Sequence, residues 1–547
     1  MYRRERTASG RVILTRLATV LVLALAGGPG ALSAAVAQDD TVAPAQSGSG
    51  DWPTWQHDPV GSRFNPAEKR INPSTVAGLR LEWAFAYPKV NQVTSGSQPA
   101  VVDGTLYVGG PDARFYALDA RTGVTRWSFD LATVAGPWDA RSPNPVRDGP
   151  AVAHGRVYFA DTRGYLYALH TDTGQLAWAT RLDDHIGVRI TSSPLVFSGR
   201  VYVGVSSSEK DLTIDPTFPC CTFRGQVVAL DARTGSVRWR YFTVPPPQPA
   251  GTWPSGAAKY APSGVAVWSS PVVDPATRTL YVGTGQNYTG TAGDADSVLA
   301  LDADTGAVRW KQQMTRADTW TLACLKPAPG DYCPGLADGT ALNYDFGSSA
   351  NIFQVNGRTL VGIGQKSGVF HTFDAATGEI VWQTQLAVPQ ANGGATGIQW
   401  GSSYDGRSLY VASWQAAPGT LFALDPASGE IRWANPNPSD GCTRGGAASY
   451  PDFCLLALTP AVTSSPGLVY EGSADGKLRI YAASTGETLW EYDTIRDFDS
   501  VNGLPGRGSA LSGNGGAVVS NGMLYVQSGY YPFYPSDRGY VLLAFGL

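Results

Sequence analysis

Five side chains that could bind a cation, move a proton or support a flat ligand lie beside apolar, strand-like segments. Glu209 and Asn287 offer hard oxygen atoms of the kind that calcium prefers. Asp345 offers a carboxylate that could accept a proton, and Lys366 offers a cation. Trp268 offers a large aromatic floor. These residue types favour a site that holds a metal ion next to a flat molecule.

Each of these residues also has a purely structural interpretation. Trp268 could belong to an ordinary core, and Glu209 could be a solvated loop charge. Asp345 could form a turn, and Lys366 could be a surface lysine. A shared site is favoured because the residues occur in successive repeats, each beside a strand.

A repeated sequence motif predicts the strands that would position these side chains. The run A-L-D-A-R-T-G-V-T-R-W predicts a hairpin in which one strand ends at Ala-Leu, Asp and Thr-Gly form a tight turn with Gly at positive φ, and a second strand ends at Trp. An apolar strand precedes each hairpin, so each unit supplies about four strands. Units of this kind at a period of roughly 40 to 70 residues are typical of a β-propeller. The copies span residues 117–127, 168–178, 229–239, 300–310, 372–382, 423–433 and 481–490.

The two ends of the chain supply the remaining blade. Residues 79–83 form a strand that ends in Trp83 and has no hairpin upstream, whereas residues 541–545 form a strand with no turn after it. If these strands share one sheet, the ring closes with strands from both termini. The sequence therefore predicts an all-β fold, an eight-bladed β-propeller.

The N-terminal residues predict export. A signal peptide is indicated over residues 1–37 by five arginines, a short apolar run from Leu17 to Ala26 and a small-residue cleavage pattern at 35–37. The segment is not expected to be a membrane helix, because the apolar run is too short to cross a bilayer. Residues 38–50 are expected to be a disordered lead-in, and 51–547 a single propeller domain. The expected location is periplasmic or secreted, with no membrane span after cleavage.

Charge and motifs disfavour several functions. Removing residues 1–37 takes away five arginines and one glutamate, so the formal charge changes from −4 to −8. An acidic exported chain is a poor partner for nucleic acid. The sequence contains no GxGxxG after a strand, no P-loop, no GxSxG and no HExxH. Hydrolase and nucleotide-binding functions are therefore disfavoured.

Six cysteines in an exported chain indicate disulfides. Cys324 and Cys333 flank one Pro/Gly-containing loop and Cys442 and Cys454 another, which favours two local bridges. The adjacent residues Cys220 and Cys221 either form a vicinal bond or pair elsewhere.

The repeated A-x-D-x-x-T-G-x-x-x-W resembles the tryptophan-docking motif of the quinoprotein alcohol dehydrogenases. Those proteins are eight-bladed propellers that hold pyrroloquinoline quinone (PQQ) and calcium on the central axis. The same motif occurs in propeller scaffolds that hold no cofactor, so the segments between the repeats must decide the function.

The segment after the second hairpin resembles the family's T-x-A-P-L-V, strand, S-G-A-E. This resemblance implies that the threonine and the small residues contact the quinone and that Glu209 ligates calcium. The implied cofactor residues are Thr191, Ser206, Ser207 and Ser208.

Later segments resemble other parts of the family's site. Trp268 is similar to the stacking tryptophan, and Asn287 to a calcium ligand, although Gln286 is inserted before it. Asp345 in Tyr344–Phe346 is similar to the catalytic base, and we also expect it to ligate the metal. Lys366 in a K-x-G segment matches a cation that faces the quinone oxygens.

Three further positions complete the resemblance. Arg147 is similar to the arginine that binds a quinone carboxylate, while Gln399 and Trp400 stand where the family has N-W. Gly96 stands where methanol-oxidising members carry a glutamate. The vicinal cysteines of those members precede the arginine segment, whereas Cys220 and Cys221 follow Glu209.

The mature chain also resembles the polyvinyl alcohol dehydrogenases, through residues 52–59, 220–225, 344–347, 523–526 and 528–530. The expected activity is oxidation of secondary alcohol groups, small or polymeric, by hydride transfer to PQQ with calcium as Lewis acid. Since the chain has no CxxCH haem motif, electrons would leave to a separate acceptor such as a cytochrome c. The alternatives are a non-catalytic propeller scaffold of the cell envelope and a dehydrogenase of small primary alcohols.

Overall fold

The computed structural model describes residues 50–90, 96–139, 143–325, 333–334, 341–389, 396–414, 418–450, 454–458, 460–511, 513, 515–529 and 540–547. The expected signal peptide, 1–37, and lead-in residues 38–49 lie outside the described residues. Gly50 is buried, and its carbonyl oxygen accepts hydrogen bonds from Asn65 Nδ2 and Ser520 Oγ. Gly50 therefore already packs into the folded body.

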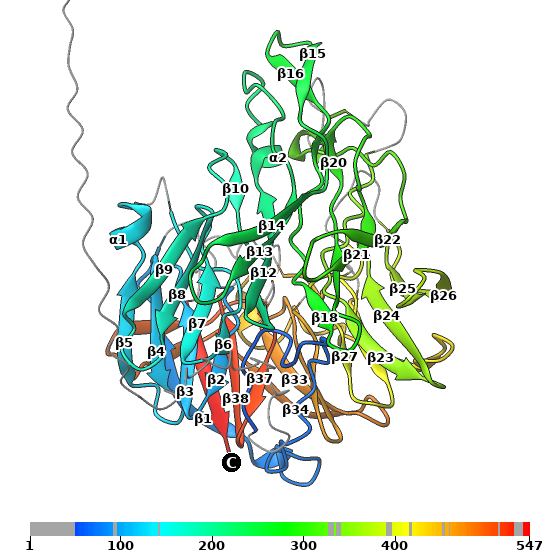
Figure 1. Cartoon of the computed structure of the whole chain (residues 1–547). Helices are drawn as coiled ribbons and strands as arrows, with labels where there is room; N and C mark the ends of the chain where they lie inside the picture. Colours follow the sequence, from blue (N-terminus) through cyan, green and yellow to red (C-terminus); the bar gives the residue numbers. More distant parts are fainter. Residues whose placement is uncertain are drawn as a thin grey trace, which may run out of the picture. The chain divides into compact units, whose positions relative to one another are not determined.

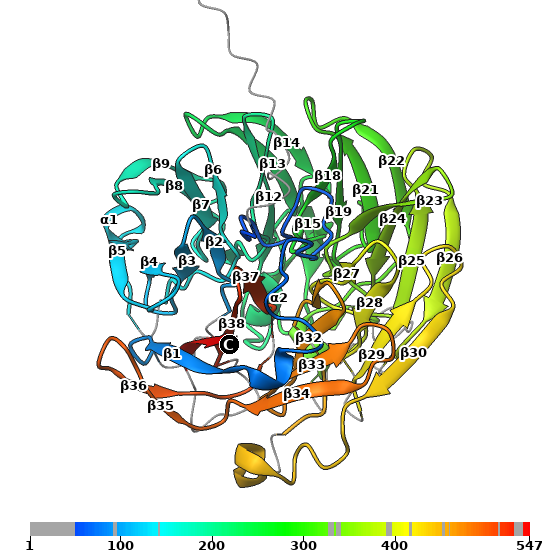
Figure 2. The same cartoon turned by 90° about the horizontal axis from the view of Figure 1, so that it is seen from below.

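The described residues from Gly50 onward form one compact unit built from eight antiparallel four-stranded blades around a central axis, and the third blade is extended by the short strand β10 (Val188–Arg189) (Figures 1 and 2). The predicted eight-bladed β-propeller is confirmed. In the described part of the chain, no helix is long and apolar enough to cross a bilayer.

The first four blades follow the chain in order, from the innermost strand to the outermost. They contain β2 (Ala100–Val102), β3 (Thr105–Gly109), β4 (Arg114–Asp119) and β5 (Thr125–Asp130); β6 (Ala151–Ala153), β7 (Arg156–Ala160), β8 (Tyr165–His170) and β9 (Leu176–Arg181); β11 (Leu195–Phe197), β12 (Arg200–Ser207), β13 (Gln226–Asp231) and β14 (Val237–Phe242); and β18 (Val272–Asp274), β19 (Thr279–Gly283), β21 (Ser297–Asp302) and β22 (Val308–Gln313).

The next three blades continue in the same way, and the eighth combines both ends of the described chain. They contain β23 (Asn351–Val355), β24 (Arg358–Gly364), β25 (Val369–Asp374) and β26 (Ile380–Gln385); β27 (Ser403–Tyr404), β28 (Leu409–Ala412), β29 (Thr420–Leu424) and β30 (Ile431–Pro436); β31 (Thr463–Ser465), β32 (Leu468–Gly472), β33 (Lys477–Ala482) and β34 (Thr488–Asp493); and β37 (Val518–Ser520), β38 (Met523–Ser528), β39 (Val541–Gly546) and β1 (Arg80–Ala86).

Short elements lie between the blades. They are the pairs β15 (Gln248–Thr252) with β16 (Ala258–Ala261), β17 (Ser263–Gly264) with β20 (Asn287–Thr289), and β35 (Asp497–Asp499) with β36 (Pro505–Arg507), the strand β10 (Val188–Arg189) beside the end of β12, and the helical turns η1 (Val76–Gly78), α1 (Ala132–Ala135), α2 (Glu209–Leu212), η2 (Leu322–Leu325) and η5 (Gly445–Ser449).

The ring closes as the two terminal strands predicted. β1 pairs antiparallel with β39 from Arg80 opposite Gly546 to Ala86 opposite Val541. Both faces of β39 are buried, since all six of its residues are inaccessible to solvent. The last blade therefore depends on residues that are more than 450 positions apart in the sequence.

The repeated tryptophans join neighbouring blades. Each indole N–H donates to a backbone carbonyl oxygen of the next blade, at nitrogen–oxygen distances of 2.9–3.3 Å. The ring also lies against the turn glycine of that blade: a Cβ on Gly378, whose φ is +76°, would come 2.7 Å from Trp310 Cδ2. The pairs are Trp83–Ala120, Trp127–Thr171, Trp178–Ala232, Trp239–Ala303, Trp310–Ala375, Trp382–Pro426, Trp433–Ala483 and Trp490–Leu79.

One detail of the predicted hairpin is wrong. The outer strand does not end at the tryptophan, because β5 continues past Trp127 to Asp130 and β22 continues past Trp310 to Gln313. These added residues still pair with the preceding strand, as Arg114 does with Asp130. The tryptophan therefore lies within the outermost strand. This strand pairs with the third strand of its own blade, and the indole N–H bonds to the next blade.

An irregular N-terminal segment, residues 50–65, drawn in dark blue, runs along the innermost strands of the blades (Figure 2). Innermost strands have one edge without a strand partner, and such an edge needs hydrogen-bond acceptors. The segment supplies them to Val101, Val152, Val273, Ile352, Tyr404 and Ser464, whose N–H groups donate to its carbonyl oxygens at 2.8–3.0 Å. It therefore covers the inner edges of β2, β6, β18, β23, β27 and β31.

Trp490 tests the ring closure. We expect Trp490→Ala to cost about 3 kcal/mol, because it removes a half-buried indole and the hydrogen bond to Leu79, and Trp490→Phe to cost about 1 kcal/mol. Urea unfolding followed by fluorescence measures both. An unchanged midpoint for Trp490→Ala would contradict a stabilising role for this contact.

Candidate active site

The topology of a blade brings the predicted residues to one end of the ring. Because the first and second strands of a blade are antiparallel, the loop that enters the first strand and the loop that leaves the second lie at the same end. Thr191, Trp268 and Asp345 precede the innermost strands β11, β18 and β23. Glu209 and Lys366 follow the second strands β12 and β24. Figure 1 shows this end at the top, with α2 and the β15–β16 hairpin.

Asp345 and Lys366 form a buried ion pair. Lys366 Nζ donates to Asp345 Oδ2 at 2.6 Å and to Asn343 Oδ1 at 3.1 Å. The side chain of Asp345 is 4 % exposed and that of Lys366 is 12 % exposed. Lys366 is therefore not a surface lysine, and Asp345 does more than form a turn.

The indole of Trp268 lies over backbone. A Cβ on Gly347 would lie 1.7 Å from Trp268 Cη2, so only glycine leaves room for the ring. Trp400 packs edge-on against Trp268, with ring centroids 5.0 Å apart and planes at 73°. Lys366 Nζ lies 5.1 Å from the ring centroid, within reach of a cation–π interaction. Trp268 is half-buried, so it is not an ordinary core residue.

Glu209 is buried at the start of α2 and is 1 % exposed. Its Oε1 accepts the N–H of Thr222 at 2.7 Å, and its Oε2 accepts the N–H of Phe223 at 2.9 Å. His185 Nε2 lies 3.4 Å from Oε1. The carboxylate is therefore held in place by backbone donors and is not a solvated loop charge.

Asn287 supplies a buried oxygen atom that could ligate a metal ion. Its Nδ2 donates to Ala292 O at 3.0 Å. Its buried Oδ1 receives no hydrogen bond from any residue that the structure describes. Such an amide oxygen fits the shell of a hard cation.

The remaining predicted cofactor residues differ in their contacts. Thr191 Oγ1 lies 3.4 Å from Ser206 Oγ, so these hydroxyls are neighbours. Ser207 Oγ accepts the N–H of Glu209 at 2.9 Å, and Ser208 Oγ donates to Gly187 O at 3.4 Å, which gives both residues local structural contacts. Gln399 Nε2 donates to Thr396 O at 3.2 Å. Arg147 lies in the loop before β6.

Asp318 is a positioning residue that the sequence did not indicate. Its carboxylate accepts the N–H groups of Leu342, Asn343 and Tyr344 at 3.0, 3.0 and 2.7 Å. Its carbonyl oxygen accepts the N–H of Asn287 at 3.1 Å. One residue thus holds both the loop that ends at Asp345 and the candidate calcium ligand.

Asp296 supports Asp318. Burial raises the pKa of Asp296 well above its usual range, and the charges of Asp318 and Asp345 add to this effect. Burial therefore favours the uncharged form of Asp296, which lies next to the carboxylate of Asp318. No motif or spacing marks either residue in the sequence.

Gln286 is the residue inserted before Asn287. Its N–H donates to Asp345 Oδ1 at 2.7 Å. With its amide turned so that nitrogen faces the carboxylate, Gln286 donates to Asp345 a second time. The insertion therefore orients Asp345.

The structure joins Cys220 to Cys221, Cys324 to Cys333 and Cys442 to Cys454. The vicinal pair is buried just before Thr222 and Phe223, the residues whose N–H groups hold Glu209. It therefore lies close to the candidate metal ligand, although at a different position in the chain from the family's vicinal pair.

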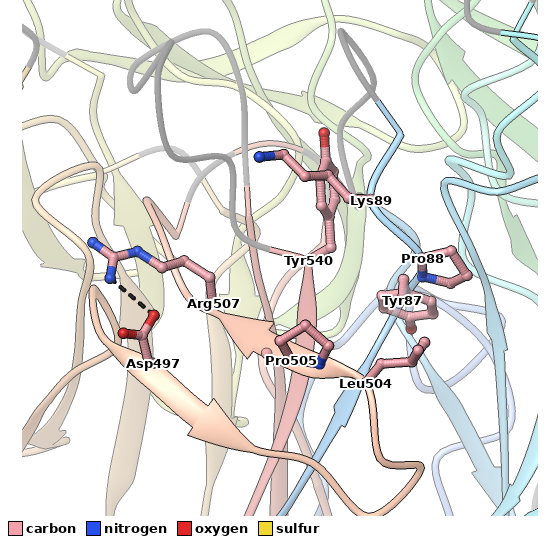
Figure 3. Close-up of a pocket in the computed structure, with 9 residues that line it drawn as sticks. Tyr87, Pro88, Lys89, Asp497, Leu504, Pro505, Arg507 and Tyr540 are labelled. Atoms are coloured by element: carbon pink, nitrogen blue, oxygen red, sulfur yellow. Dashed lines mark hydrogen bonds and ion pairs between the residues drawn. The ribbon is translucent and has the colours of Figure 1, made fainter.

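Two other features of the described residues carry none of the predicted site. No three His, Cys, Asp or Glu side chains there form a ready-made metal cluster. The predicted calcium site does not require three such side chains, because Asn287 and a cofactor would supply the other ligands. A cavity of about 260 Å³ opens near the ends of β1 and β36 (Figure 3). It is lined by Tyr87, Pro88, Lys89, Asp497, Leu504, Pro505, Gly506, Arg507 and Tyr540.

Eight four-stranded blades joined by indole hydrogen bonds define the class of tryptophan-docked β-propellers. The family described as "Glucose/ethanol/alcohol dehydrogenase, beta-propeller domain" matches residues 52–324, and "Outer membrane protein assembly factor BamB" matches residues 365–534. The chain is 33% identical over 497 residues to a polyvinylalcohol dehydrogenase of Sphingopyxis sp. (strain 113P3), covering 88% of this chain and 72% of that protein. The chain belongs to the family of PQQ-dependent alcohol dehydrogenases that includes the polyvinylalcohol dehydrogenases.

Further relatives agree with this family. A quinohemoprotein alcohol dehydrogenase of Comamonas testosteroni is 27% identical over 558 residues, which cover 85% of this chain and 73% of that protein. A crystal structure of the quinohemoprotein alcohol dehydrogenase from Comamonas testosteroni has a TM-score of 0.65 at 21% identity, covering 91% of this chain and 80% of that one. The structure of a europium-containing methanol dehydrogenase has a TM-score of 0.65 at 19% identity, and the match covers 92% of this chain and 99% of that one. At these identities the two structures support the fold alone.

Proposed function

We propose that this chain is a periplasmic or secreted quinoprotein that oxidises secondary alcohol groups, including those of polyvinyl alcohol, with Asp345 as the base. The observation that carries the proposal is the buried Asp345–Lys366 pair beside the half-buried Trp268 ring. A propeller scaffold has no need for a buried carboxylate, a lysine and an open indole at one end of its axis.

The residues present fit PQQ and calcium. Trp268 would lie under the flat ring system, and Arg147, Thr191 and Ser206 would contact its polar edge. Glu209, Asn287 and Asp345 would ligate the metal with oxygen atoms, which calcium prefers. When bound, PQQ supplies a hydride acceptor and calcium supplies the Lewis acid that polarises it.

Asp345 would accept the proton of the substrate hydroxyl. Its Oδ1 is oriented by the N–H of Gln286, and its Oδ2 lies 2.6 Å from Lys366 Nζ. The ammonium group of Lys366 pairs with this carboxylate and fixes its orientation. Asp318 would hold the loop before Asp345 at a fixed distance from the substrate. Electrons would then leave to a separate acceptor such as a cytochrome c.

The test is reconstitution of the purified chain with PQQ and calcium. We expect dye reduction that needs both additions and that is faster with secondary alcohols and polyvinyl alcohol oligomers than with primary alcohols. Faster oxidation of small primary alcohols would contradict the substrate class. No dye reduction with any alcohol at full quinone occupancy would favour the scaffold function.

Glu209 tests the metal assignment. We expect Glu209→Gln to weaken calcium binding about 10- to 100-fold and to lower activity in parallel, because the ligand loses its charge, and high calcium should partly restore both. Calcium titration and dye reduction measure the two effects. Glu430→Gln, an exposed turn residue, is the matched control. Lost activity with unchanged calcium affinity would contradict the ligand role.

A further inference from the structure

Arg189 lies beside the candidate cofactor residues. It belongs to β10, where it is the antiparallel partner of Ser206 on β12. Directly opposed residues of an antiparallel pair project from the same face. Thr191 Oγ1 is 3.4 Å from Ser206 Oγ, so Arg189, Ser206 and Thr191 share one face. The main chain of Arg189 is fixed there, because Ser206 Oγ donates to its carbonyl oxygen at 2.6 Å.

The side chain of Arg189 is exposed and can reach a ligand. Nearby protein atoms lower its pKa, because they displace part of the water around the guanidinium. Among the described residues, its guanidinium donates no hydrogen bond to a protein acceptor.

The charges around Arg189 favour an anion. The charge of Arg147 acts on Arg189 and also lowers its pKa, so the two cations lie close enough to repel. Asp211 is the acid that offsets this repulsion in part. Two neighbouring arginines are stabilised by a ligand that carries carboxylates, because each guanidinium can donate two parallel hydrogen bonds to a carboxylate.

We propose that Arg189 is a second cofactor-binding arginine, which together with Arg147 holds the carboxylates of the quinone across blades 2 and 3. This inference rests on the proposed function, since it assumes that PQQ is the ligand. It adds a contact to the site: the aromatic rings are held by Trp268, while the acidic edge is held by a pair of arginines.

Quinone binding to the apo-protein tests the inference without any turnover. The purified full chain is stripped of cofactor and titrated with PQQ in calcium, with tryptophan fluorescence as the readout. We expect Arg189→Ala to weaken binding about 10- to 100-fold, the usual scale for a charge-assisted hydrogen bond to a buried ligand. Arg233→Ala, an exposed turn residue of the same blade, should bind as the unaltered chain does.

The methyl ester of PQQ separates charge from shape. Because the ester lacks carboxylates, Arg189→Ala and the unaltered chain should bind it equally. If Arg189→Ala fails to fold, Arg189→Gln keeps the first three side-chain carbons and a polar end without the charge, and it gives the same comparison. Equal PQQ affinity of the variant and the unaltered chain would overturn the role of Arg189, whereas failure of the unaltered chain to bind PQQ would overturn the proposed function instead.

Discussion

Replacing Asp345 with asparagine should lower the turnover of a secondary alcohol at least about a hundredfold when PQQ and calcium are kept at saturating concentrations. An alcohol near neutral pH does not lose its proton unaided, so a carboxylate must accept it as the carbonyl product forms. Asparagine keeps the shape of the side chain, and its Oδ1 can still accept the N–H of Gln286. Its amide nitrogen, however, cannot accept a proton.

The measurement combines dye-linked turnover with cofactor absorbance, so that lost chemistry is separated from lost occupancy. Asp374→Asn is the matched control, since Asp374 lies in the hairpin turn of the same blade and pairs with Arg358 at the outer edge. That variant should keep its turnover. Near-normal turnover of Asp345→Asn at full occupancy would place the base elsewhere and end the assignment of residues 344–346.

The fold was predictable because its information is local and repeated. Each hairpin carries its own turn residues, such as Asp119, whose Oδ1 accepts the N–H groups of Arg121 and Thr122. Each also carries its own tryptophan for the next blade. The ring closure was predictable as well, because residues 79–83 and 541–545 each form a strand without a hairpin partner next to it in the sequence.

The path of segment 50–65 along the innermost strands was not predictable in this way. Its carbonyl oxygens meet innermost strands from most of the ring, so no periodic pattern in the segment itself records its partners. The end of the outer strand was placed wrongly for a related reason. The repeat ends at the tryptophan, whereas the pairing of Asp130 with Arg114 depends on the neighbouring strand.

Part of the candidate site followed from the sequence because loops at one end of successive blades must converge. Asp345, Lys366 and Trp268 flank strands of known order, and the structure brings these three into contact. Asp318 and Arg189 were missed because each acts across a long separation: Asp318 reaches residues 342–344, and Arg189 faces Ser206 through strand pairing. Single residues in irregular loops give no signal until their partners are known.

Replacing Trp268 with alanine should weaken PQQ binding by about 2–4 kcal/mol, roughly 30- to 1000-fold, and leave the propeller folded. The estimate combines the loss of a large buried apolar surface with the loss of ring stacking. The fold should survive because Trp268 is half-buried and is not one of the eight indoles that join blades.

Two controls make the Trp268 result specific. Trp268→Phe keeps a smaller ring over Gly347 and should lose less affinity than the alanine variant. Trp138→Ala removes a partly buried tryptophan from a different cluster, near Leu131 and Val134, and should bind PQQ normally. The binding curves come from equilibrium dialysis, since the substitution alters tryptophan fluorescence. Unchanged affinity in a folded Trp268→Ala variant would remove this ring from the cofactor site, and the stacking floor would then have to be Trp400, which lies 5.0 Å away.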